Sequence, residues 1–308
     1  MTSAQDPRGL RRGAGAAEPA SALVPGAAHA PDAAPGALSA GDIELRLLME
    51  AIYLRYSYDF RDYTGASQKR RVAYALGQLD LPSISALQER VLREPAMFAR
   101  LLQYLTVPVS EMFRDPAYFL ALRQQVVPHL HTYPSVTVWV AGCSTGEEVY
   151  SLAILLREEG LLERTRIYAT DINPESLAQA RQGIFPLDAV RRYTANYQRS
   201  GGKRAFSDYY TAAYDAARFD PTLCADVIFA DHSLATDSVF AQTQLVSCRN
   251  VLIYFNRALQ DRALGLFHES LSYRGFLGLG SKESIDFSNW SGHFDTLARA
   301  ERIFRKAS

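Results

Sequence analysis

The pattern of apolar and polar positions divides the chain into three stretches. Residues 1–40 are rich in Ala, Pro and Gly and show no sustained period, so we expect a disordered arm there. From Ile43 onward, apolar residues such as Leu47, Ile52 and Leu54 recur near helical spacing among polar ones. Further amphipathic segments follow as far as Thr106. The pattern predicts a small helical domain, assigned to residues 41–115, and a second domain over residues 116–308.

Beyond Pro134 the pattern changes to alternating strands and helices. A β-branched run, a helix closed by Gly160, a second strand and a second helix follow one another in "VTVWVA", "EEVYSLAILLREEG", "RIYATDI" and "PESLAQARQG". This order predicts a βαβ unit with a parallel sheet. Three later apolar segments, "ADVIFADHS", "TQLVSCRNVLIYF" and "GFLGLGSKES", end in polar residues. Because ligands of open α/β sheets gather beyond the carboxyl ends of the strands, we expect the functional site there.

A Tyr-rich stretch interrupts this alternation between about residues 187 and 225. It is typical of an insertion into the second domain. Gly201-Gly202 is its candidate hairpin turn.

Composition narrows the functional classes. Lys+Arg and Asp+Glu are both 33, so the formal net charge is zero and no global field favours nucleic acid or an anionic membrane. The three cysteines have no CxxC spacing, which disfavours a zinc site and a disulfide framework. No apolar run reaches the roughly 20 residues of a membrane span, and the N-terminus lacks the apolar core of a signal peptide. We expect a cytoplasmic protein that does not insert into membranes.

The turn in "VWVAGCSTGEEVY" holds the candidate chemistry. Gly142 and Gly146 allow the backbone to approach a ligand closely. Glu147 and Glu148 in the first helical turn would repel a phosphate but suit a cation. Asp171, at the end of the next strand, is placed to accept hydrogen bonds from a ribose. A nucleoside with a positive, phosphate-free appendage is S-adenosylmethionine; alternatively, the glycines only shape a tight turn and the acids only begin a helix.

Four motifs in the same order resemble the CheR-type chemotaxis methyltransferases, which transfer a methyl group from S-adenosylmethionine to glutamate side chains of chemoreceptors. These motifs are "VSEMFRDPAYF", "AGCSTGEEVYSLA", "YATDINPESLAQARQGIF" and "VSCRNVLIYFN", and the resemblance covers roughly residues 43–306. It implies an α/β class I methyltransferase fold, Rossmann-like with a mostly parallel sheet. It also implies a small all-helical N-terminal domain and an inserted β-subdomain, which would account for residues 187–225.

The resemblance also implies the roles of individual residues. The implied cofactor-binding residues are Ser110, Arg114, Gly142, Glu148, Asp171, Ser233, Leu234, Arg249 and Asn250. The implied catalytic residues are Arg114, Arg249 and Tyr254. Either arginine is expected to orient a carboxylate, with Tyr254 near the transferring methyl group. The sequence departs from the family pattern at Pro108, Met112 and Ser233. Methyl transfer to a carboxylate needs no metal and no general base, so His232 is expected to be structural.

The expected partner is the cytoplasmic helical bundle of a chemoreceptor. A basic group, Lys69, Arg70 and Arg71 in "SQKRRV", is predicted to dock its acidic helices, as in the family. We expect a monomer that recognises its receptor without a C-terminal tether. A cofactor sensor or signalling scaffold with little transferase activity is the alternative. A methyltransferase for nucleic acid or small molecules is disfavoured by the neutral charge and by the absence of a base-methylation motif.

Overall fold

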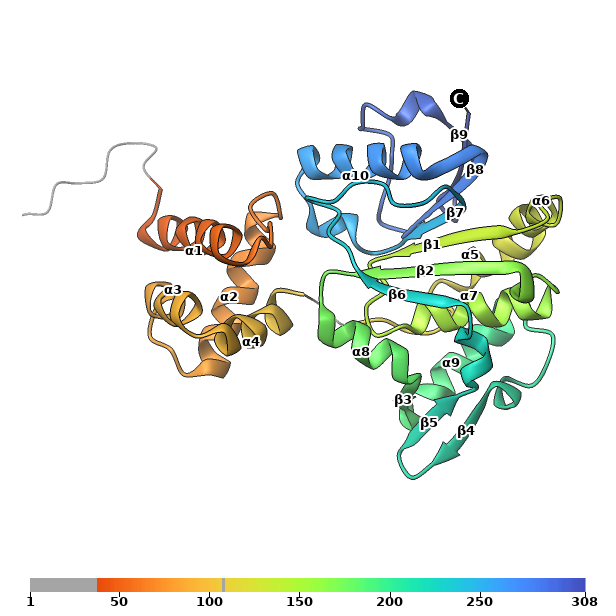
Figure 1. The fold of residues 1–308 in the computed structure, drawn as a ribbon, viewed down its shortest axis with the longest axis horizontal. Coiled ribbons are helices and arrows are strands. Elements are labelled where there is room, and N and C mark those ends of the chain that lie inside the picture. The colour runs from red at the N-terminus through yellow and green to blue at the C-terminus, as the bar shows by residue number, and fades with distance from the viewer. Residues whose placement is uncertain (1–37, 107–108, 308) are drawn as a thin grey trace, which may run out of the picture. The chain divides into compact units, whose positions relative to one another are not determined.

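The computed structural model describes residues 38–106 and 109–307 of the chain. The predicted disordered arm therefore lies almost wholly outside the described residues, as does Pro108. The described part begins with four helices, α1 (Ala40–Tyr56), α2 (Gly65–Leu79), α3 (Ile84–Arg93) and α4 (Pro95–Leu105) (Figure 1). Ser39 and Ser83 accept hydrogen bonds from backbone amides at the starts of α1 and α3, which satisfies donors that a helix leaves unpaired.

The buried face of α1 differs from the apolar positions that predicted the helix. Ile52 is buried, but Ile43, Leu47 and Leu54 are exposed. Besides Ile52, the residues of α1 that lie in the core of the four helices are Leu45, Leu48 and Met49. The helix was thus predicted correctly, and apolar residues lie on two of its faces, one of which is buried.

A seven-stranded sheet forms the centre of the second domain. Its strands are β1 (Val136–Ala141), β2 (Thr165–Asp171), β6 (Val227–Asp231), β7 (Thr243–Cys248), β8 (Leu271–Leu279), β9 (Phe294–Ala298) and β10 (Ile303–Lys306). Their order is β6-β2-β1-β7-β8-β10-β9, and the first five run parallel while β10 is antiparallel to both of its neighbours. The mostly parallel α/β sheet is confirmed, and it brings the carboxyl ends of β6, β2, β1 and β7 to one edge.

Helices cover both faces of this sheet. One face carries α7 (Glu147–Glu158) and a preceding helical segment made of α5 (Pro116–Ala121), a π-helical turn (Leu122–Val126) and α6 (Val127–Leu130). The other face carries α10 (Arg257–Ser270). Successive residues of β1 alternate between the two cores, with Val138 and Val140 in the first and Trp139 in the second. This burial on both faces explains why β1 reads as a continuous apolar run.

The Tyr-rich stretch folds as a small antiparallel sheet of order β3-β5-β4. After α8 (Pro174–Gln182), β3 (Ile184–Pro186) lies just before the predicted stretch, which contains α9 (Leu187–Arg199), β4 (Tyr210–Ala213) and β5 (Ala216–Phe219) (Figure 1). The predicted hairpin at Gly201-Gly202 is wrong. Gly201, with φ of +78°, lies just beyond the end of α9, and the hairpin instead turns at Tyr214 and Asp215. The division into arm and domains at the predicted bounds stays a prediction.

None of the helices in the described part of the chain combines the length and the apolar character needed to cross a membrane.

Candidate functional site

The turn between β1 and α7 lies at the carboxyl edge of the sheet. The backbone N–H groups of Gly142 and Cys143 donate to the Thr170 carbonyl at 2.8 and 2.9 Å. Gly142 has a φ of +74°, and a Cβ atom there would lie 2.4 Å from Cγ2 of Val251. Only glycine therefore lets this turn lie against the loop that follows β7.

Asp171 ties this turn to the start of α8. One carboxylate oxygen accepts the N–H of Ser144 at 2.8 Å, and the other accepts the N–H of Asn173 at 2.9 Å. Burial raises the pKa of Asp171 above that of an exposed Asp, while these backbone donors oppose the shift. Each oxygen has a second lone pair, so both can still accept a hydrogen bond from a ligand hydroxyl.

Glu148 is held in place by side chains of the neighbouring strand β7 and of Arg249, which follows that strand. Its two oxygens accept from the Ser247 hydroxyl at 2.6 Å and from the Arg249 guanidinium at 3.2 Å. The guanidinium, 1% exposed, also donates at 2.8 Å to the Arg114 carbonyl and to Asp115, and it lies 4.1 Å from the ring centre of Tyr118. Because it is already shared among these partners, the geometry favours a positioning role for Arg249 over the predicted catalytic one.

Arg114 differs from Arg249 in its surroundings. Its one hydrogen bond to the described residues is a long contact of 3.5 Å from its side chain to the Val109 carbonyl, and no carboxylate of the described chain pairs with it. The guanidinium is therefore free to bind an anion. Of the two arginines that the sequence left undecided, Arg114 is the one placed to orient a carboxylate.

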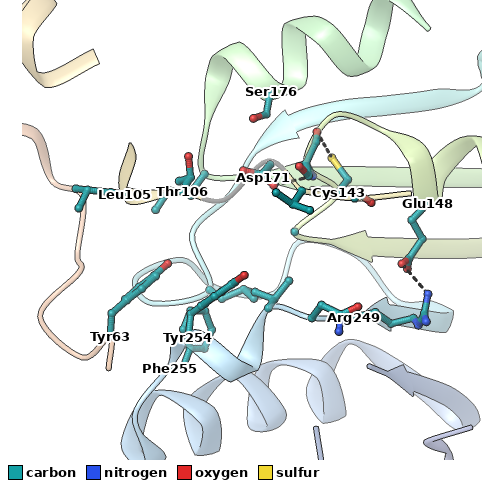
Figure 2. A pocket seen from close by; sticks show the side chains of 18 of the residues that line it. Tyr63, Leu105, Thr106, Cys143, Glu148, Asp171, Ser176, Arg249, Tyr254 and Phe255 are labelled. Carbon is teal, nitrogen blue, oxygen red and sulfur yellow. Dashed lines mark hydrogen bonds and ion pairs between the residues drawn. The ribbon is translucent and has the colours of Figure 1, made fainter. Parts of the chain in front are cut away.

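A cavity at this edge gathers most of the predicted residues (Figure 2). The predicted residues that line it are Ser110, Arg114, Gly142, Glu148, Asp171, Leu234, Arg249, Asn250 and Tyr254. Ser233 is not among them, and its expected contact with the cofactor stays a prediction. Its N–H donates to Asp237 and its hydroxyl accepts the N–H of Ala235, so Ser233 serves a local turn beside a neighbouring hollow.

His232 lines the cavity, although the sequence predicted only a structural role for it. Its Nε2 lies 3.2 Å from the Ser238 carbonyl, so it carries the proton and Nδ1 is left as an acceptor. Among the described residues, buried Nδ1 has no hydrogen-bond partner, and the same holds for the Ser144 hydroxyl and the side-chain oxygen of Asn250. Such atoms around one cavity are expected where a polar ligand completes their bonding.

Arg71 also reaches this cavity, from helix α2. It is only 8% exposed, donates to the Leu105 carbonyl and lies 4.3 Å from the ring centre of Tyr254. The prediction that Arg71 belongs to a docking surface is wrong, because its side chain is buried against that ring. Helical spacing could have shown this, since Arg71 shares the buried face of α2 with Ala75 and Leu79.

The two basic neighbours of Arg71 lie outside the cavity. Arg70 is exposed on α2, and Lys69 forms an ion pair with Asp42 of α1. The predicted docking role remains open for these two residues only.

The lining fits S-adenosylmethionine. Asp171 offers acceptors for a ribose, His232 an acceptor for an adenine amino group, and Glu148 a negative charge for the positive appendage. Ser144 and Asn250 have positive φ angles of 50° and 62°, a strained conformation that is common where backbone is shaped around a ligand.

Loss of the Asp171 carboxylate is expected to weaken cofactor binding. In Asp171→Ala, charge-assisted bonds of about 1.5–3 kcal/mol each are lost, so S-adenosylmethionine and S-adenosylhomocysteine both bind at least about tenfold more weakly. Since its pKa is raised, Asp171 takes up a proton at a higher pH than an exposed Asp, and on acidification wild-type affinity should fall at a higher pH than an exposed Asp would give. Calorimetric titrations with Asp171→Asn as the control, which should lose part of this pH dependence, check both effects. Normal binding by Asp171→Ala would contradict them.

Comparison with known proteins decides the family. Residues 108–300 match the CheR methyltransferase, SAM binding domain, and residues 43–106 match the CheR methyltransferase, all-alpha domain. The chain belongs to the CheR methyltransferase family. Its fold is that of a class I methyltransferase with an all-helical N-terminal domain, and its cofactor is S-adenosylmethionine, as the sequence predicted.

Named relatives share most of this CheR-family chain. A putative methyltransferase, Cher3, of Pseudomonas putida strain KT2440 is 69% identical over 266 residues, covering 86% of this chain and 97% of that protein. Chemotaxis protein methyltransferase 2 of Pseudomonas aeruginosa strain PAO1 is 30% identical over 70% of this chain and 77% of its own length. A chemotaxis protein methyltransferase of Listeria monocytogenes strain EGD-e is 28% identical over 74% of this chain and 84% of its own length.

Proposed function

We propose that this protein transfers a methyl group from S-adenosylmethionine to glutamate carboxylates on the cytoplasmic helices of a chemoreceptor, forming methyl esters. The observation that carries the proposal is one cavity that joins a cofactor-binding edge, Asp171 and Glu148, to two arginines: Arg71, which lies against the ring of Tyr254, and Arg114. The names of the chemotaxis relatives support the receptor as the substrate. The reaction would take place in the cytoplasm, where such helices lie.

The reaction requires the protein to align the reacting groups more than to transfer a proton. Bound S-adenosylmethionine would supply a methyl group on a positively charged sulfur. A glutamate oxygen would form the new C–O bond with one of its lone pairs, while the electron pair of the breaking C–S bond stays on sulfur, which becomes neutral. The carboxylate is already ionised at neutral pH, so no side chain has to remove a proton. Asp171 and Glu148 hold the nucleoside and amino-acid ends, and the cavity excludes water from the reacting atoms.

Each of the two arginines would bind a different carboxylate. Arg114 extends from the segment before α5, free of acidic partners in the described chain, and would bind the carboxylate of the cofactor's methionine moiety. Arg71 stacks on Tyr254 and would bind the incoming glutamate. A buried guanidinium attracts a carboxylate more strongly than an exposed one, because less water screens it.

Among the departures from the family pattern, the one at Met112 gives no support to a sensor without activity. Met112 is fully buried in the hydrophobic core and does not line the cavity. Ser233 also lies outside it. The departure at Met112 therefore removes no contact from the cavity, and transferase activity is the favoured function.

Exposed basic residues of α2 are expected to contribute to receptor docking. Arg70→Glu should raise the receptor KM several-fold and flatten its dependence on salt, because long-range attraction to acidic helices is lost. Affinity for S-adenosylhomocysteine should be unchanged, since Arg70 does not line the cavity. Initial rates across a salt series measure the effect. The matched control is Arg166→Glu, an exposed arginine near the opposite end of β2; identical kinetics of the two variants would exclude docking through Arg70.

The proposal is tested with methyl-labelled S-adenosylmethionine and the cytoplasmic fragments of chemoreceptors from the same genome. Methyl esters of glutamate release methanol under base, whereas methylated amines and most other methylated groups do not. Base-labile label on a receptor fragment supports the proposal. Cofactor binding without base-labile label on any fragment would overturn it.

A further inference from the structure

A buried carboxylate lies in the polar segment that follows β8. Glu283 is 4% exposed, and within the described part of the chain no cation pairs with it. One of its oxygens accepts the N–H groups of Asn250 at 2.9 Å and Gly280 at 2.6 Å. The other oxygen accepts the N–H of Ile253 at 3.3 Å. Its partners are thus backbone amides, and two of them belong to the loop after β7.

The backbone N–H groups that donate to Glu283 require a side-chain group that only accepts hydrogen bonds. Removing a carboxylate from water is unfavourable, so burial raises the pKa of Glu283, while the backbone donors stabilise its ionised form. A glutamine of the same shape would turn an NH₂ group toward at least one of the amides, which leaves donors facing each other. A carboxylate is therefore the side-chain group that suits these backbone N–H donors.

The loop held by Glu283 forms one wall of the cavity. Asn250 has a φ of +62°, in the left-handed region that Asn adopts more readily than most other residues, so the loop makes a sharp turn at this position. The loop and β8 are also closely packed, because a Cβ atom at Gly280 would lie 2.8 Å from the Asn250 nitrogen. Beyond Asn250, the same loop carries Tyr254 to its position beside Arg71. Loss of the Glu283 bonds would free both wall residues at once.

We propose that Glu283 is a positioning residue for the transfer step, which fixes the segment from Asn250 to Tyr254 at the reacting end of the cavity. The inference rests on the proposed methyl transfer and adds a residue that does not itself line the cavity. Asp171 and Glu148 belong to β2 and α7, so these two cofactor contacts do not depend on this loop, although that of Asn250 does. Glu283 should therefore affect turnover more than cofactor binding.

The first test is kinetic. Glu283→Gln is expected to lower kcat about 10- to 100-fold, because small misplacements of reacting groups have effects of this size, while S-adenosylhomocysteine binds within about threefold of wild type. The matched control is Asp261→Asn. Asp261 also braces the segment after β8, by accepting the Asn289 N–H at 3.0 Å, but it does not contact the loop after β7. Wild-type kcat in Glu283→Gln, or an equal loss in Asp261→Asn, would overturn the proposal.

The second test does not depend on methyl transfer. In amide NMR spectra, Glu283→Gln should shift the signals of Asn250, Ile253 and Gly280, which lose a charged acceptor, and leave that of Ser144 in place. Unmoved signals would overturn the proposal whether or not the wild type methylates a receptor. A wild type that methylates no receptor would instead reject the proposed function. Glu283→Asp keeps the charge with a shorter reach and should give an intermediate kcat. If neither variant folds, Glu283 serves the fold alone and the proposal fails.

Discussion

Arg71→Ala is expected to reduce kcat/KM for receptor methylation by at least about 100-fold, a loss of about 2.7 kcal/mol in transition-state stabilisation. Its guanidinium is buried against Tyr254 at the wall of the cavity, where a glutamate would lose most of its water on entry. Without Arg71, the entering carboxylate would be desolvated and unpaired, which is unfavourable by several kcal/mol.

The neighbouring Arg70 supplies the control for this experiment. Arg70→Ala removes the same charge from the same helix, but at an exposed position, and should change kcat/KM only a few-fold. S-adenosylhomocysteine should bind Arg71→Ala within about threefold of wild type, since Arg71 comes from α2 rather than from the cofactor edge. Equal effects of the two substitutions would contradict a substrate-binding role for Arg71.

Arg249→Ala is expected to lower the free energy of unfolding by about 3–5 kcal/mol, because removing one partner of a buried ion pair leaves the other uncompensated. Arg249 joins Glu148 of α7 to Asp115 and the Arg114 carbonyl, so two segments of the chain lose their common donor. Cofactor affinity should fall as well, since Glu148 keeps only its bond from Ser247. Urea unfolding monitored by circular dichroism measures the stability.

A comparison variant separates this effect from a general loss of arginine. Arg166→Ala removes an exposed arginine from β2 and should change the unfolding free energy by no more than about 0.5 kcal/mol. A loss below about 1 kcal/mol in Arg249→Ala would show that the buried network contributes little, and the positioning role assigned to Arg249 would be wrong.

The sequence predicted those parts of the site that are local along the chain. Gly142 and Glu148 lie in the turn and helix directly after β1, and Asp171 ends the next strand, so strand order alone brings them to one edge. A parallel βαβ unit admits few other arrangements. The position of the cofactor-binding edge therefore follows from the order of strands and helices along the chain.

The parts of the site that sequence patterns do not predict depend on contacts between distant segments. Ser247 and Tyr118, 129 residues apart, form the hydrogen bond beneath Glu148. Glu283 lies in a polar segment, and its role depends on a hydrogen bond from the loop after β7, which is distant in the sequence. Arg71 looked like one residue of a basic surface group until the burial of α2 separated it from Arg70. None of these pairings has a short sequence motif.

The measurement that tests the central claim most directly is peptide mass spectrometry of a receptor fragment after incubation with the protein and S-adenosylmethionine. The expected result is a mass increase of one methylene on specific glutamates of the cytoplasmic helices, lost after mild base and at least about tenfold smaller with Asp171→Ala. Modification that resists base or falls on other side chains, or full modification by Asp171→Ala, would contradict the account.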